Sequence, residues 1–388
     1  MQSPAMGTSL IIDNWMLQDV NAALQGGLSG EPSGEIVLDV QRGTHDFVFV
    51  PHAVFQIDAL LTFLVSIVFR DILVVDGGFT HVWDKGSPSL LDLRQNGILH
   101  PFDFLRAEDA IAEPRKVIVD RLCVTKSILD IQRANERSWQ MNEESEDKGM
   151  SQLVWGAAGY LARSHVYETP YLGCPFRQAF IRQTGFVNTS RDAVRRVDTV
   201  INTKRAKLWR SLSNEVEGAY AAFRLPPVAV EIIGDSHDPN QLIPVALQLR
   251  EKYKPLRNWL GEYQRALDSQ MPQDIRKHVR LLESIGGDVN ARYPAKGVDG
   301  VEMSVTTNWL PLNVKVEGVS VARLITGVRN RFGVRAMLSR LVFSQQGDKG
   351  LRKLLNMFGE RNSRLSMETY EHLIRRYSFV SSPSLFSE

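Results

Sequence analysis

The apolar positions between residues 240 and 286 repeat with the spacing of a helical packing seam. They advance by four and three residues in turn, the heptad spacing that keeps one helical stripe facing a partner. A second stripe follows a short turn around Pro272. We therefore expect an antiparallel helical hairpin over 240–286, with a kink near Pro255. The two stripes comprise Leu242, Ala246, Leu249, Tyr253, Leu256, Leu260, Tyr263 and Leu267, then Ile275, Val279, Leu282 and Ile285.

Shorter apolar runs dominate the N-terminal third. Residues 8–24 predict a strand that enters a helix, or one helix throughout. Residues 35–40 and 46–50 flank a glycine-containing turn and predict a β-hairpin. Residues 51–70 predict a buried helix, and the continuous apolar run 72–75 predicts a strand that is covered on both faces. Together these runs indicate a small α/β part.

The remaining pattern is mostly helical. Helical periodicity covers 107–140, 149–168 and 190–223, although 116–120 also fits a strand. Small residues at 156–159 leave one side of the second helix open to the close approach of another helix. Residues 228–233 predict a strand or an extended segment. Further on we expect a hairpin of strands at 301–305 and 312–316, and then helices at 319–331, 334–343, 351–358 and 367–377.

These elements predict an α+β, helix-rich fold. Its parts would be a small N-terminal α/β part, the central antiparallel helical hairpin and a C-terminal α+β part. The acidic run 143–149 and the glycines at 286–287 are the expected boundaries. The predicted domains are an acidic N-terminal α/β domain (1–142), a helical domain (150–290) and a basic C-terminal α+β domain (291–388).

Composition indicates a soluble globular chain in a reducing compartment. The chain has 388 residues, of which 43% are hydrophobic and 23% are charged. Its two cysteines, Cys123 and Cys174, are too few for a disulfide framework or a thiolate zinc site. The N-terminus lacks the pattern of a signal peptide. The uncharged run 59–69 is shorter than the roughly 20 residues of a membrane span, so we expect a cytoplasmic protein without a membrane partner.

Charge is unevenly distributed along the chain. Residues 1–176 hold 13 basic and 23 acidic residues (net −10), whereas residues 177–388 hold 33 and 21 (net +12). The basic half is a candidate phosphate-binding surface, and the alternative is that the two halves attract each other. The segment 319–377 carries 12 basic and four acidic residues. Its candidate nucleic-acid-binding residues are Arg329, Arg331, Arg335, Arg340, Arg352 and Lys353.

Carboxylates at the ends of expected strands are the first candidates for catalysis. Metal-dependent nucleases gather such groups because Mg²⁺ or Mn²⁺ requires several oxygen ligands close together. The candidate metal ligands are Asp13, Asp76, Asp120 and Asp235. The alternative is that each aspartate caps the turn after its strand, which is common in α/β proteins. A metal cofactor is therefore expected only if the chain is a nuclease.

Two other catalytic patterns are weaker. Arg94 and His100 have the six-residue spacing of an RNase pair on one helix face, but Asn96-Gly97 interrupts the helix. Cys123 has the surroundings of a core residue, and Cys174 lies between Gly173 and Pro175 with His165 and His237 as possible partners; a buried thiol is far commoner than a catalytic one. Neither pattern identifies a reaction.

The sequence favours a non-enzymatic interaction or scaffold subunit. Its basic C-terminal half would contact nucleic acid or an acidic protein partner, and self-association is a further expectation. The alternative function is the metal-dependent nuclease.

Overall fold

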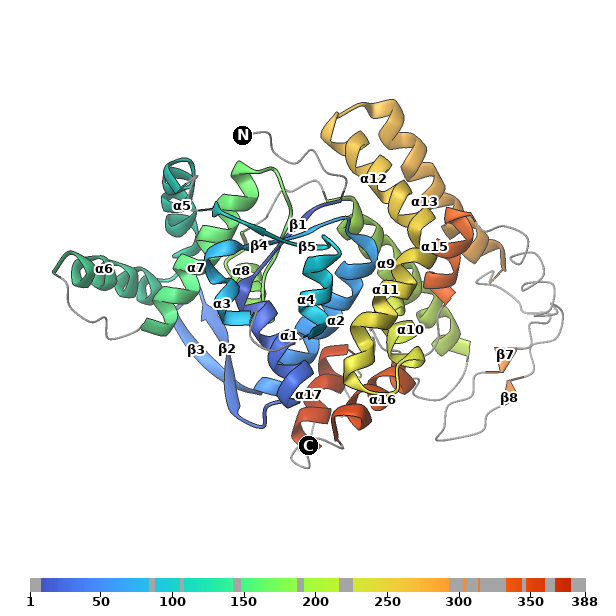
Figure 1. Ribbon diagram of the computed structural model, residues 1–388, viewed down its shortest axis with the longest axis horizontal. Helices are drawn as coiled ribbons and strands as arrows, with labels where there is room; N and C mark the ends of the chain where they lie inside the picture. Colours follow the sequence, from blue (N-terminus) through green and yellow to red (C-terminus); the bar gives the residue numbers. More distant parts are fainter. Residues whose placement is uncertain are drawn as a thin grey trace.

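A parallel sheet of four short strands lies near the middle of the computed structural model (Figure 1). In spatial order the strands are β5 (Leu99–Phe102), β4 (Leu73–Asp76), β1 (Leu10–Ile12) and β6 (Tyr171–Leu172). The structure describes residues 8–83, 88–104, 108–141, 148–186, 192–215, 226–292, 303–304, 313–314, 333–343, 347–359 and 367–377. The helix-rich α+β fold is thereby confirmed, and the expected N-terminal α/β part is present.

Helices cover both faces of this sheet because its side chains alternate between two apolar cores. Leu10 and Ile12 enter the larger core, whereas Ile11 between them enters the smaller one. On the first face lie α1 (Asn14–Gly26), α2 (His52–Phe69) and α4 (Pro88–Gln95). On the second lie α5 (Glu108–Leu122), α6 (Lys126–Met141), α7 (Lys148–Val166) and α8 (Pro175–Gln183). Two short turns of helix, η1 (Gly77–Phe79) and α3 (Thr80–Trp83), follow β4.

Helix α2 is the central element of the larger core. Fourteen of its 18 residues are buried. By length and composition it is apolar enough to cross a membrane, but 78% of it is buried inside the protein, as in the core helix of a soluble protein. It contacts α1, α10 (Pro227–Asp235), α11 (Leu242–Lys252) and α17 (Met367–Tyr377). Elements from both ends of the chain therefore enclose it.

Strands β2 (Pro32–Asp39) and β3 (Thr44–Pro51) form a separate two-stranded antiparallel ribbon. The predicted hairpin is confirmed, with Ile36 opposite Phe47 and Leu38 opposite His45. The ribbon connects α1 to α2 and lies to one side of the main sheet (Figure 1).

The seam of residues 240–286 forms three helices after the short η3 (Pro239–Gln241). Helix α11 ends at Lys252, and α12 (Lys254–Asp268) begins one residue later with Pro255 in its first turn. The expected kink is thus a helix break. Helix α13 (Pro272–Arg292) returns beside α12 (Figure 1). The eight seam side chains from Leu242 to Leu267 are buried in the chain's own core, against α2 and α9 (Ala193–Glu215).

The strand or extended segment expected at 228–233 is wrong, whereas at 116–120 the helical interpretation is confirmed over its strand alternative. Residues 228–233 are in helix α10 and are not a strand, because Pro227 occupies the first helical turn, which proline favours. Residues 116–120 continue helix α5. Strands β5 and β6 were missed because runs of four and two residues carry too little periodicity.

The C-terminal part contains a small hairpin and three helices. Strands β7 (Met303–Ser304) and β8 (Asn313–Val314) are antiparallel, as expected. Helices α15 (Val334–Phe343), α16 (Gly347–Gly359) and α17 follow. The helix expected at 319–331 lies outside the described residues, as does most of the acidic run 143–149. The larger core joins residues from all three expected domains, so the division into independent domains stays a prediction.

Candidate functional site

The carboxyl edge of the parallel sheet is the expected location of a ligand-binding or catalytic site. In an open α/β sheet, ligands bind where the strand order reverses, outside the carboxyl ends of the strands. Here the order reverses beside β1, because β4 and β6 flank it on opposite sides. Asp13 follows β1 directly and Asp76 ends β4, so two of the four predicted metal ligands do lie at this edge.

Asp13 is fully buried and its two carboxylate oxygens accept four hydrogen bonds. Oδ1 accepts from the backbone N–H of Trp15 at 2.9 Å and from Arg177 Nη1 at 2.6 Å. Oδ2 accepts from the hydroxyl of Tyr171 at 2.5 Å and from the backbone N–H of Cys174 at 3.3 Å. The side chain therefore caps α1 and also ties it to β6 and α8.

The Arg177 guanidinium completes this arrangement from α8. It lies over the ring of Trp15, with 3.7 Å between its central carbon and the ring centroid. Burial alone would lower the pKa of Arg177, but Asp13 more than offsets that effect, so its pKa lies above the usual value. The guanidinium fits because α7 has a glycine there: a Cβ on Gly156 would come within 2.4 Å of Nη2.

Asp76, at the end of the neighbouring strand β4, is also paired with an arginine, Arg163 of α7. Its Oδ1 accepts from the backbone N–H of Gly78 at 3.0 Å, and its Oδ2 lies 2.8 Å from Arg163 Nη2. Arg163 in turn lies over the ring of Phe104 at 4.7 Å. As the sequence alternative proposed, Asp76 caps the turn after its strand.

Two stacked tyrosines fill the space between these ion pairs. The rings of Tyr160 and Tyr171 are 5.0 Å apart and nearly parallel. The hydroxyl of Tyr160 donates to Asn14 Oδ1 at 2.7 Å and accepts from the Asn14 backbone N–H at 2.9 Å. Burial, and then the charge of Asp13, raises the pKa of both phenols, which therefore stay protonated. They act as neutral hydrogen-bonding groups.

The carboxylate of Asp13 is fully occupied by partners within the protein. A carboxylate that ligates Mg²⁺ or accepts a proton requires a free lone pair. The four bonds to Asp13 use its lone pairs, and Arg177 holds the negative charge in place. The arrangement is that of a structural joint between β1, α1, β6 and α8.

The other two predicted metal ligands are elsewhere. Asp120 is exposed on α5 and Asp235 is exposed at the end of α10, since both expected strands are helices. Among the residues that the structure describes, no group of three or more His, Cys, Asp or Glu side chains could hold a metal ion. The nuclease hypothesis thus keeps Asp13 and Asp76 at one edge of the sheet, but no third carboxylate of the described residues joins them in a metal-binding group.

The remaining catalytic candidates are separate as well. Arg94 lies near the end of α4, and His100 lies in β5, so they do not share a helix face. Cys174 is buried at the start of α8, where burial and Asp13 hold its pKa well above the usual value. Burial raises the pKa of Cys123 to about 11. Both thiols are protonated and unreactive at neutral pH.

The predicted basic surface is only partly described. Arg329 and Arg331 lie outside the described residues. Arg335 and Arg340 are exposed on α15, and Arg340 Nη2 lies 2.8 Å from Glu231 Oε1 of α10. Arg352 and Lys353 lie on α16, where Lys353 donates to the backbone oxygen of Gly234 at 2.6 Å. Some of this positive charge is therefore used within the molecule.

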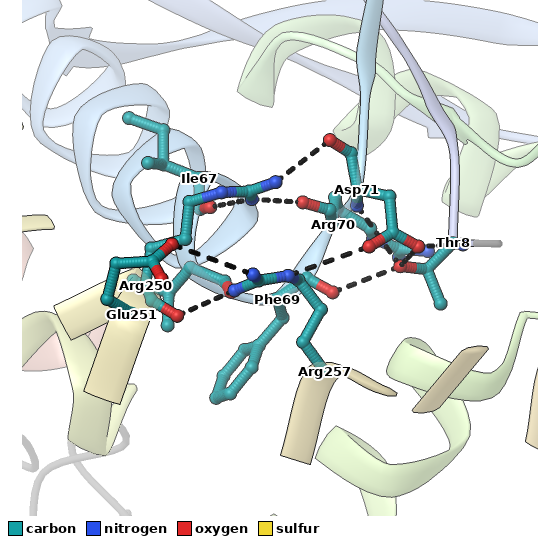
Figure 2. A network of polar contacts seen from close by, with 9 residues as sticks. Thr8, Ile67, Phe69, Arg70, Asp71, Arg250, Glu251 and Arg257 are labelled. Atoms are coloured by element: carbon teal, nitrogen blue, oxygen red, sulfur yellow. Dashed lines mark hydrogen bonds and ion pairs between the residues drawn. The ribbon is translucent and has the colours of Figure 1, made fainter. Parts of the chain in front are cut away.

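At the opposite, amino edge of the sheet, two arginines of the central helices cap α2 (Figure 2). Arg250 donates to the backbone oxygens of Ile67 at 2.6 Å and Asp71 at 3.0 Å, and also to that of Arg70. Arg257 donates to the backbone oxygen of Arg250 at 2.6 Å. Because the last carbonyls of a helix lack partners within it, these arginines complete α2 and join it to α11 and α12.

A buried ion pair extends this joint to α9. Both terminal nitrogens of Arg70 bind the carboxylate of Asp192, at 2.8 and 2.7 Å. Asp192 also accepts from the backbone N–H groups of Val194 and Arg195 at the start of α9. Burial alone would raise the pKa of Asp192, but Arg70 outweighs it and the pKa is lowered. The amino-edge network is likewise structural.

The β2–β3 ribbon is the surface that these internal networks leave open. Nine large apolar side chains are exposed within the described chain, and five of them belong to this hairpin. On β3, Phe47 is 57% exposed, Val48 51% and Phe49 46%. Val37 of β2 and Val40 of the turn are the other two. Consecutive exposed apolar residues on a strand are unusual, because successive side chains point to opposite faces and at least one face is normally covered.

One edge of this ribbon is sealed and the other is open. Gln183 of α8 accepts from the backbone N–H of Leu38 at 2.8 Å and donates to the backbone oxygen of Ile36 at 2.5 Å. The backbone groups of these two residues therefore point away from β3. In an antiparallel ladder, the residues opposite them, His45 and Phe47, must likewise point away from β2. Because this direction alternates from residue to residue, the backbone groups of Phe49 also point away from β2.

Sequence reasoning found Asp13 and Asp76 but missed Arg177, Tyr171 and the exposed ribbon. The side-chain partners of Asp13 are more than 150 residues further along the chain, and no local pattern connects them. The run Phe47–Val50 did predict a strand of the hairpin, but the pattern did not indicate whether its apolar side chains would be covered. Comparisons of the chain with family models, curated proteins and solved structures found no match.

Proposed function

We propose that this chain is a non-enzymatic interaction subunit of a reducing cytoplasm and that it docks a protein partner on the β2–β3 ribbon. The observation that carries the proposal is the run of three exposed apolar residues, Phe47, Val48 and Phe49, on a strand with an open edge. Exposed edges of this kind promote unwanted association, and proteins normally cover or charge them. A partner that covers the strand resolves this exposure.

The closed carboxyl edge supports this proposal over the nuclease alternative. A nuclease of the expected kind requires at least three oxygen ligands around shared metal positions. Asp13 and Asp76 are each held by an arginine instead. Incubation of the chain with nucleic acid, with and without Mg²⁺ or Mn²⁺, tests the alternative. Metal-dependent degradation of the nucleic acid would make these two aspartates candidate active-site residues again.

A second binding function rests on the basic C-terminal segment. Residues 319–377 carry a net charge of +8, from 12 basic and four acidic residues. We propose that this segment contacts nucleic acid or an acidic protein partner. Binding of a nucleic-acid duplex should weaken as salt rises, and a double change of Arg335 and Arg352 to Glu should reduce the salt slope. An unchanged slope would exclude these two residues from the contact.

Site-specific photo-crosslinking tests the ribbon. A photo-reactive phenylalanine analogue at position 47, illuminated in cells of the source organism, should produce a discrete adduct with a protein partner. The same analogue at position 79 is the matched control, because Phe79 is 42% exposed but belongs to η1 and not to the ribbon. Absence of an adduct at position 47, or equal adducts at both positions, would contradict the proposal.

A further inference from the structure

We propose that the partner supplies an extended strand that pairs with the open edge of β3 and carries a lysine or arginine opposite Asp46. The inference rests on the proposed function, since it specifies what docks on the same ribbon. The partner strand would also place apolar side chains opposite Phe47 and Phe49. Three features of the ribbon support such a strand: the direction of its backbone groups, the chemistry of its two faces, and the charges on one of those faces.

The backbone of β3 is ready to accept a third strand. The N–H and C=O groups of His45, Phe47 and Phe49 point away from β2, as deduced from the bonds of Gln183. Within the described part of the chain, the backbone groups of Phe47 and Phe49 have no hydrogen-bond partner. Addition of an extended peptide to such an edge is a common recognition mode, in which backbone bonds give affinity and alternate side chains give specificity.

The structure fixes both ends of the ribbon and leaves its middle accessible. At the turn, the backbone N–H of Ser127 of α6 donates to the backbone oxygen of Gly43 at 3.1 Å, and the ring of His45 bonds the hydroxyl of Ser127 at 2.8 Å. At the other end, the backbone N–H of His52 donates to the backbone oxygen of Glu31 at 3.2 Å. Residues 46–49 between these contacts are all exposed. The edge is thus rigidly presented and long enough for a peptide of about four to six residues.

The two faces of β3 differ in chemistry. Phe47 and Phe49 share one face with Ile36, since directly opposite residues point the same way. Asp46 and Val48 share the other face with Val37 and Glu35. A partner strand therefore meets aromatic rings on one side, and a carboxylate beside valines on the other.

Asp46 is the acidic residue of the ribbon that is left for a partner. Asp39 is paired with Arg42 at 3.5 Å, and Glu35 is paired with Arg376. Asp46 is exposed, and no ion pair to it occurs within the described chain. A cation on the added strand at the directly opposite position would complete the row, because opposite charges across strands stabilise pairing.

The same carboxylate disfavours a second copy of this chain as the occupant. If two copies paired antiparallel with Phe47 opposite Phe47, the two Asp46 side chains would be diagonal neighbours, about 7–8 Å apart on one face. The register with Phe47 opposite His45 would place them directly opposite each other. Of these three registers, only the one with Phe47 opposite Phe49 separates the two carboxylates. Like charges in these positions oppose pairing, which is one way in which proteins protect exposed edges.

A library of random dodecapeptides displayed on phage, selected on the full chain, tests the inference. We expect the selected peptides to alternate apolar residues with a lysine or arginine at one intervening position. Asp46→Lys should instead select aspartate or glutamate at that position. Asp92→Lys is the charge-matched control, because Asp92 is an exposed aspartate on α4; it should select the same peptides as the natural chain.

A proline substitution tests whether the backbone edge is used. Phe49→Pro removes an N–H that points away from β2, and edge strands tolerate proline there, so the ribbon should stay folded. Its circular dichroism should be unchanged, and the selected peptides should no longer bind it. A synthetic form of a selected peptide should bind the natural chain about two- to fivefold more tightly than its Lys→Glu version, and Asp46→Asn should abolish that difference.

Three outcomes would overturn the inference. In the first, the natural chain and Asp46→Lys select the same peptides. In the second, Phe49→Pro still binds the selected peptides. In the third, the natural chain forms a dimer in analytical ultracentrifugation and Phe49→Pro does not. The last would identify a second copy as the occupant. If a partner is crosslinked at position 47 and either of the first two outcomes is observed, the proposed docking function is still supported and only the strand pairing is rejected.

Discussion

At the scale of single residues, the ion pair of Asp13 and Arg177 shows how this fold uses buried charge. Both side chains are at most 5% exposed, and each is surrounded by donors, acceptors or rings that suit its charge. Isolated charges would be very unfavourable in this environment. The pair therefore contributes less through its own attraction than through the penalty for breaking it.

Arg177→Met should strongly destabilise the protein. The change leaves Asp13 buried and charged without its cation, and loss of one partner of such a pair costs about 3–5 kcal/mol in free energy of unfolding. The double variant Asp13→Asn with Arg177→Met should be less destabilised than Arg177→Met alone, because no uncompensated charge remains. Urea unfolding at pH 7 measures both. Equal losses in the two variants would mean that packing on Trp15, and not charge, is what Arg177 provides.

Asp58 of α2 gives the molecule a pH-dependent residue. Its carboxylate pairs with Arg376 and accepts from the hydroxyl of Tyr377, both on α17. Burial raises the pKa of Asp58 from 3.8 to about 6, although Arg376 acts in the opposite direction. Since the folded protein binds this proton more tightly than the unfolded chain does, the contribution of Asp58 to stability is largest below about pH 4 and decreases as pH rises to about 6.

Asp58→Asn should remove this dependence. We expect the free energy of unfolding of the natural chain, relative to that of Asp58→Asn, to fall as pH rises from 4 to 6, because the asparagine does not ionise. Urea unfolding of both proteins at several pH values in this window measures the difference. A constant difference would show that Asp58 titrates alike in the folded and unfolded chains.

At the scale of elements, the small residues of α7 do allow close approach, but what approaches them differs from the prediction. The sequence predicted that residues 156–159 would allow another helix to approach. In the structure, Gly156 accommodates the guanidinium of Arg177, and Gly159 lies beside Arg115, with 3.7 Å between a Cβ built there and Nε. The small face therefore admits two arginine side chains.

Gly156→Ala and Gly261→Ala should have opposite effects. A methyl group at position 156 would overlap the guanidinium of Arg177, which Asp13 and Trp15 prevent from moving away, so stability should fall. At position 261 in α12, no atom apart from the chain neighbours and the backbone of α12 lies within 4 Å of the added carbon, and alanine favours helix over glycine by about 0.5–1 kcal/mol. Thermal unfolding of both variants checks this, and a gain at position 156 would contradict the geometry.

The sequence predicted long elements well and short ones poorly. The hairpin of β2 and β3, helix α2 and the C-terminal helices α15 to α17 were expected within a few residues of their positions, because their periodicity extends over enough residues. The short strand β4 was also predicted, because its run is continuously apolar. The order of the sheet was not predictable, since β6 has two residues and is recruited from beyond α7. The polar joints were equally hidden, because Arg177 and Arg250 bind groups that are distant in sequence.

At the scale of the whole molecule, the larger core is continuous across both expected domain boundaries. It contains Ile12 of β1, Leu249 of α11 and Leu354 of α16. The uneven charge also has a partly internal use, since Arg257 and Arg376 from the basic half pair with Asp71 and Asp58 of the acidic half. The remaining basic charge is what the proposed second binding function would use.

Unfolding should therefore occur without separation of the N-terminal and central parts. We expect urea unfolding followed by far-ultraviolet circular dichroism and by tryptophan fluorescence to give coincident transitions. A fragment of residues 1–142 should not fold alone, because it lacks β6, the arginines that complete α2, and the helices that cover it. Two well-separated transitions, or a folded 1–142 fragment, would support the three-domain division that the sequence predicted.

The position of α2 also matters while the chain is being made. Its last residue, Phe69, leaves the ribosome 308 residues before Tyr377, the end of α17. At roughly 5–20 residues per second, this interval is about 15 to 60 seconds. A helix apolar enough to resemble a membrane segment lacks α10 and α11 for about the first half of this interval, and it lacks α17 until the end. Nascent chains of this protein should therefore depend on chaperones far more than the finished molecule does.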